Sequence, residues 1–94
     1  MNQARVVLNG LIRRFYYFLG MGDEERAQGY RLLSEKAWNL YAGRTQKAGE
    51  RLALPSHAEL TRDMWQRIRE GGEGFSEGMV RALESRLATQ PPPP

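Results

Sequence analysis

Residues 56–72, SHAELTRDMWQRIREGG, carry the clearest structural signal in the sequence. Ser56 and Glu59 form a capping box, in which the two side chains satisfy each other's free backbone N–H groups at the start of a helix. The Gly71-Gly72 pair marks where this helix ends, because glycine readily adopts the left-handed conformation found after a last helical turn. The apolar residues between these limits recur at a spacing of four, which predicts one buried face. That face consists of Leu60, Met64 and Ile68, with Trp65 beside it.

Apolar spacings of three and four also occur on both sides of this stretch, whereas no segment alternates apolar and polar residues as a strand does. The sequence therefore predicts an all-α fold, a small bundle of about four helices. We expect a single domain over residues 1–90, followed by an extended proline tail over residues 91–94.

Three further helices are expected. The first covers residues 4–19 and is ended by the glycines at 20 and 22, with a core stripe of Ala4, Leu8, Leu11, Ile12, Phe15 and Leu19. The second begins after Asp23, a good N-cap, continues past Gly43 and ends no later than Pro55. Its expected inward face is Ala27, Tyr30, Leu33, Ala37, Trp38, Leu40 and Tyr41. The last begins at Ser76, with Met79, Val80, Leu83 and Leu87 on its stripe.

Composition restricts the chemistry that the chain can perform. The 94 residues include no cysteine, which excludes disulfides, thiolate metal sites and thiol nucleophiles. The single histidine, His57, directly follows a helix cap, where exposure is usual, and the sequence suggests neither a nucleophile nor an orienting group for it. Gly71-Gly72-Glu73-Gly74 lacks the Lys-Ser/Thr ending of a phosphate-binding loop. We therefore expect no enzymatic activity, no catalytic residue, no cofactor, no metal and no small-molecule substrate.

The helix expected over residues 4–19 is apolar on more than its core stripe. Val6, Gly10, Arg13 and Tyr17 form a second stripe nearly opposite the first, beside Arg14 and Phe18. A helix that is apolar most of the way round is normally buried most of the way round, which three short helices achieve with difficulty. Aromatic residues and arginine are enriched in protein interfaces. The candidate partner-binding residues are therefore Val6, Gly10, Arg13, Arg14, Tyr17 and Phe18. The alternative is that this helix is simply the centre of the bundle.

These features favour a non-catalytic accessory or adaptor subunit that docks onto a larger protein complex through its N-terminal helix. Two alternatives stay open. An arginine-bearing amphipathic helix could lie on a membrane surface, and the basic stripe Arg44, Lys47 and Arg51 could contact nucleic acid, although the formal net charge is only +3. No apolar run is long enough for a signal peptide or a membrane span, so we expect a cytoplasmic protein, with association to a membrane through its partner as an alternative. Twelve of the fourteen basic residues are arginine, which suggests GC-rich coding in a bacterium or phage.

Overall fold

The computed structural model describes residues 3–47 and 54–89, in which helices are the only regular elements. The four helices are α1 (Gln3–Gly20), α2 (Glu24–Lys47), α3 (His57–Glu70) and α4 (Glu77–Thr89). The all-α prediction is confirmed, and each helix lies where its apolar spacing and its capping residues place it. The proline tail at residues 91–94 lies outside the described residues.

The helix ends follow local sequence. Each of the predicted N-caps Asp23, Ser56 and Ser76 accepts a hydrogen bond from the backbone N–H three residues further on, at 3.1, 3.1 and 3.2 Å. The ends of α1 and α3 are glycine turns, in which Gly22 and Gly71 have φ angles of 83° and 92°. Such left-handed angles cost glycine little, and the turns satisfy the last carbonyl groups of both helices.

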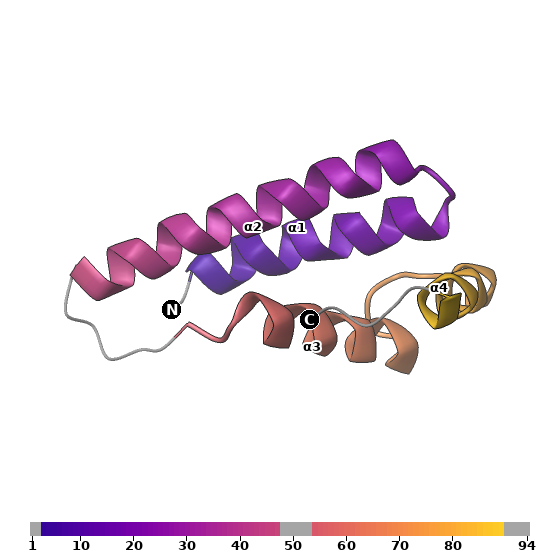
Figure 1. The fold of residues 1–94 in the computed structure, drawn as a ribbon. Helices are drawn as coiled ribbons and strands as arrows, with labels where there is room; N and C mark the ends of the chain where they lie inside the picture. Colours follow the sequence, from indigo (N-terminus) through magenta and orange to yellow (C-terminus); the bar gives the residue numbers. More distant parts are fainter. Residues whose placement is uncertain (1–2, 48–53, 90–94) are drawn as a thin grey trace.

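Figure 1 shows how the four helices are arranged. Helices α1 and α2 lie side by side as an antiparallel hairpin, α3 runs along α1 in the same direction, and α4 crosses the end of the molecule near the turn between α1 and α2. Helix α1 packs against each of the other three. It is therefore the central helix of the bundle. This arrangement agrees with the alternative explanation of its wide apolar surface, that the helix is buried by its neighbours within the chain.

The core is a single cluster built around α1. Of the predicted core stripe of this helix, Leu8, Ile12 and Leu19 are at most 3% exposed. The other three members, Ala4, Leu11 and Phe15, are half-buried. The predicted stripe of α3 is buried against it in full. The buried apolar residues from the other helices are Ala27, Leu60, Met64, Ile68 and Leu83.

Tyr16 joins the core from the flank of the α1 stripe. Its ring stacks on Trp65 with centroids 5.6 Å apart, and its hydroxyl donates to the Thr61 carbonyl at 3.2 Å. Burial raises the pKa of Tyr16 to about 12, because the phenolate would lose its hydration. Tyr16 is therefore a neutral hydrogen-bond donor that joins α1 to α3.

The predicted inward face of α2 is wrong in two positions. Leu33 and Leu40 are 53% and 54% exposed, whereas the polar Ser34 is only 1% exposed. The small side chains of Ala27 and Ser34 are buried toward the other helices, with the half-buried Trp38 on the same side. The inward face of α2 is thus rotated away from the two leucines, which are left on the surface.

Candidate docking surface

The six candidate partner-binding residues of α1 do not form one surface in the folded chain. Arg13 and Tyr17 contact the loop between α3 and α4. The Arg13 guanidinium donates from Nε and Nη2 to the Glu73 carbonyl at 3.1 and 2.8 Å and lies 5.6 Å from the centroid of the Phe75 ring. Tyr17 meets the same ring edge-on at 6.0 Å. Both residues therefore have a structural role within the chain.

The other four candidates, Val6, Gly10, Arg14 and Phe18, have different surroundings. Val6 is 67% exposed, next to a side of α1 that no other described helix covers. The Arg14 guanidinium lies against Gly10, so that a Cβ atom at Gly10 would be 3.4 Å from Arg14 Nη1. Phe18 is half-buried and stacks on Tyr30 of α2, with ring centroids 5.5 Å apart and an angle of 3° between the planes. Phe18 thus marks the side of α1 that faces α2.

A stripe on α1 continues from Phe18 toward the start of the helix. Arg14 and Val7 lie four and eleven residues before Phe18, close to one and three whole turns, so the three residues lie on one side. Arg14 is exposed and Val7 is 43% exposed. Tyr16, which packs on α3, points to a different side of α1. This stripe therefore borders α2 on the side away from α3.

A matching stripe runs along α2. Arg26, Leu33, Leu40 and Arg44 are separated by seven, seven and four residues, which again places them on one side of a helix. The Arg26 guanidinium lies 5.6 Å from the centroid of the Phe18 ring, so the two stripes meet there. We call the surface that they form the hairpin face. It consists of Val7, Arg14 and Phe18 of α1 with Arg26, Tyr30, Leu33, Leu40 and Arg44 of α2.

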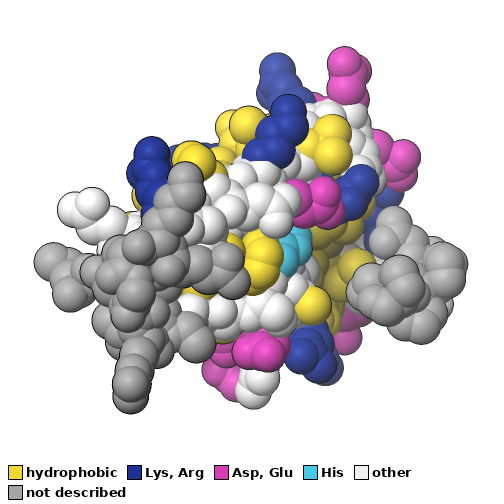
Figure 2. All heavy atoms as spheres, turned by 60° about the vertical axis from the view of Figure 1, so that its left-hand side comes forward, with side chains coloured by type: hydrophobic (Ala, Val, Ile, Leu, Met, Phe, Trp, Pro, Cys, Tyr) yellow, Lys and Arg dark blue, Asp and Glu magenta, His cyan; other side chains and the backbone are white. Residues whose placement is uncertain are grey.

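The hairpin face combines exposed apolar side chains with arginine. Val7, Leu33 and Leu40 are three of the seven large apolar residues that are exposed in the described part of the chain. Along the upper edge of the molecule, which α2 forms in Figure 1, Figure 2 shows hydrophobic side chains interleaved with lysine and arginine, with acidic side chains toward its right-hand end. Exposed apolar side chains combined with arginine are typical of protein interaction sites.

Positive charge surrounds these apolar side chains. Arg26 and Arg44 lie toward the two ends of the α2 stripe and Arg14 lies within the α1 stripe, whereas neither stripe contains an acidic residue. Arg26 pairs with Asp23 at 3.6 Å. Arg14 and Arg44 form no ion pair with any described residue. The Lys47 side chain and Arg51, the other members of the predicted basic stripe, lie outside the described part of the chain.

His57, expected to be an exposed surface residue, is half-buried between α2 and α3. Its Nε2 atom lies 2.9 Å from the hydroxyl of the buried Ser34. The Ser34 hydroxyl donates its only proton to the Arg31 carbonyl at 2.8 Å, so His57 must donate to Ser34 in return. Histidine is coloured cyan in Figure 2 and is visible at the surface beside this junction. The pair joins the start of α3 to α2.

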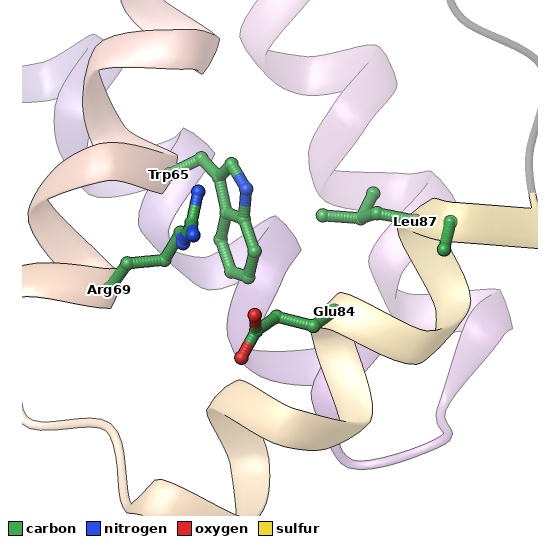
Figure 3. Close-up of a pocket in the computed structure, with 5 residues that line it drawn as sticks. Trp65, Arg69, Glu84 and Leu87 are labelled. Atoms are coloured by element: carbon green, nitrogen blue, oxygen red, sulfur yellow. The ribbon is translucent and has the colours of Figure 1, made fainter.

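A hollow of about 280 Å³ lies between α3 and α4 (Figure 3). The indole of Trp65 forms one wall, with the Arg69 guanidinium 5.8 Å from its ring centroid, and Glu84 and Leu87 of α4 stand opposite. Its walls are surface side chains, and no buried polar atom within the described ranges lacks a hydrogen-bond partner. The hollow is lined by one basic and one acidic side chain together with apolar groups.

Residues 3–47 and 54–89 lack two features, a metal-binding cluster and a membrane-spanning helix. These residues include no cluster of three histidine, aspartate or glutamate side chains that could hold a metal ion. None of their helices has the length and apolar character needed to cross a bilayer. The chain matches no family model, no curated protein and no solved structure.

Proposed function

We propose that this chain is a helical accessory or adaptor subunit that docks onto a larger protein through the hairpin face. The observation that carries the proposal is the exposure of Leu33 and Leu40 beside Val7. In a chain of 94 residues, apolar side chains that could strengthen the core are instead on one side of the surface. Association with a protein partner would remove them from water, which supplies the driving force for binding.

The arrangement of the hairpin supports the same proposal. Helix α3 packs Leu60, Met64 and Ile68 mainly against α1 of the hairpin. Away from α3, apolar side chains of both hairpin helices are exposed, namely Val7 of α1 and Leu33 and Leu40 of α2. A helix pair accepts a third helix when side chains of the newcomer fit between those of the pair. Docking of a partner helix would therefore add a further helix to the hairpin, on the side away from α3.

The proposal is tested by site-specific photo-crosslinking in the organism that encodes the chain. A photoreactive amino acid at Val7 would lie on the hairpin face, and the matched control is the same amino acid at Arg62, an exposed position on α3. We expect a discrete protein adduct from position 7 that mass spectrometry identifies, and none of that size from position 62. An absence of adducts at position 7, or the same adducts from both positions, would overturn the proposal.

A further inference from the structure

The charge on the hairpin face restricts what can bind there. Arg14, Arg26 and Arg44 surround the apolar side chains, and neither stripe offers an acidic residue in exchange. A second copy of the chain docked by the same face would place arginines near arginines and would bury them without counter-charges. The face therefore fits a surface of opposite charge better than it fits itself.

The shape of the face restricts the partner further. Its exposed leucines border a seam between two helices, and Arg26 lies over the Phe18 ring. A row of projecting side chains can fill such a seam. A bilayer surface instead favours an amphipathic helix whose apolar side chains project freely into the lipid. The length of the seam from Val7 to Phe18 corresponds to about three helical turns, or roughly 17 Å at 1.5 Å per residue.

We infer that the hairpin face binds an acidic amphipathic helix of a partner protein. The helix lies along the seam between α1 and α2, with apolar residues at spacings of three and four against Val7, Leu33 and Leu40. Its aspartate or glutamate side chains pair with Arg14 and Arg44, since arginine can grip a carboxylate with two parallel hydrogen bonds. This inference rests on the proposed function and adds the chemical class of the partner.

The test uses a pair of synthetic helices as probes. Both are helix-stabilised peptides of about fourteen residues, long enough to cover the seam, because unassisted helices of that length are marginal in water. They share a leucine stripe with the spacing of α3, and one has glutamate where the other has lysine on its flanks. Fluorescence anisotropy of the labelled peptides measures their affinity for the full chain. We expect the acidic peptide to bind at least tenfold more tightly than the basic one.

Two sets of variants locate the binding site. Leu33→Ser with Leu40→Ser should weaken the acidic peptide at least tenfold, whereas Leu32→Ser should not. Leu32 is 50% exposed and next in sequence to Leu33, but it points about a hundred degrees away around the helix. Arg14→Glu with Arg44→Glu should reverse the preference toward the basic peptide. The same reversal at the exposed Arg62 and Arg81 on α3 and α4 should leave the preference unchanged.

Several outcomes would overturn the inference. Equal affinities for the acidic and the basic peptide would show that the partner need not be acidic. A loss of peptide affinity in Leu32→Ser as large as in the Leu33→Ser, Leu40→Ser variant would show that the binding site is not the hairpin face. Binding to phosphatidylserine vesicles that disappears with Leu33→Ser and Leu40→Ser would assign the face to a membrane. A dimer in sedimentation experiments that the same variant dissociates would assign it to a second copy. Circular dichroism of each variant checks that the helices are intact.

The failures of the two proposals are distinguishable. A protein adduct at position 7 whose crosslinked segment is not an acidic helix would remove this inference and leave the docking function standing. A lack of any adduct at position 7 would remove the docking function itself.

Discussion

The Arg13 side chain of α1 makes contacts within the chain that stabilise the fold. Its planar guanidinium donates two hydrogen bonds, from Nε and Nη2, that converge on one oxygen, the Glu73 carbonyl. The Glu73 carboxylate in turn accepts a hydrogen bond from Arg67 at 3.0 Å. Arg13 therefore connects α1 to the segment between α3 and α4 through a geometry that lysine cannot reproduce.

Arg13→Lys should consequently destabilise the fold although it keeps the charge. We expect a loss of about 1–2 kcal/mol in the free energy of unfolding, the usual worth of hydrogen bonds that involve a charged group in a partly exposed site. In a domain of this size, that lowers the melting temperature by several degrees. The matched control is Arg14→Lys at the next position, which should change stability by less than about 0.5 kcal/mol. Equal melting temperatures for the two variants would contradict this role of Arg13.

His57 should make stability depend on pH. Burial lowers its pKa below the ordinary 6.5 and the charge of Arg31 lowers it further, whereas Glu35 acts in the opposite direction. The unfolded chain therefore binds the proton more readily, and stability must fall as pH decreases below about 6.5. Thermal melts between about pH 7.5 and 5 should show this decline, and His57→Gln, which does not titrate, should reduce it. A decline of the same size in that variant would assign the pH dependence to other groups.

At the scale of elements, a leucine of α2 and a leucine of α3 differ in what they contribute to stability. Leu33 is 53% exposed, so Leu33→Ala should cost no more than about 0.5 kcal/mol, as for most surface substitutions. Leu60 of α3 is 1% exposed, and Leu60→Ala should cost about 2–5 kcal/mol because it leaves a cavity in the core. Chemical denaturation of both variants measures the difference. A large loss at Leu33 would mean that its side chain is buried.

The inward face of α2 could not be assigned from sequence for a physical reason. Apolar residues occur on several sides of this helix, and the adjacent Leu32 and Leu33 cannot both face inward. The position that does face inward, Ser34, is polar, and it is buried because His57, twenty-three residues away, donates a hydrogen bond to it. A pairing over that separation leaves no trace in the local spacing. The small residues Ala27 and Ser34, seven apart, were the only available sign of close packing.

The candidate site was predictable only in part for a related reason. Arg14 and Phe18 were identified from the width of the apolar surface on α1. Leu33 and Leu40, which complete the hairpin face, depend on the rotation of α2. The contacts of Arg13 and Tyr17 depend on the position of the segment around Phe75, which lies far from them in the sequence. By contrast, helix ends depend on residues within one turn, and Asp23, Ser56 and Ser76 marked them correctly.

At the scale of the whole molecule, the two tryptophans lie where the second half of the chain meets the hairpin. Trp38 donates from its indole N–H to the Pro55 carbonyl at 2.8 Å, and Trp65 stacks on Tyr16. Intrinsic fluorescence should therefore report contact between the two halves, whereas far-ultraviolet circular dichroism reports helix content. Coincident thermal transitions in the two signals are expected if the hairpin has no stability of its own. A fluorescence change at a lower temperature than the circular dichroism change would show instead that α1 and α2 stay helical after the rest of the chain has dissociated from them. The two tryptophans are thus an intrinsic optical probe that distinguishes the two cases.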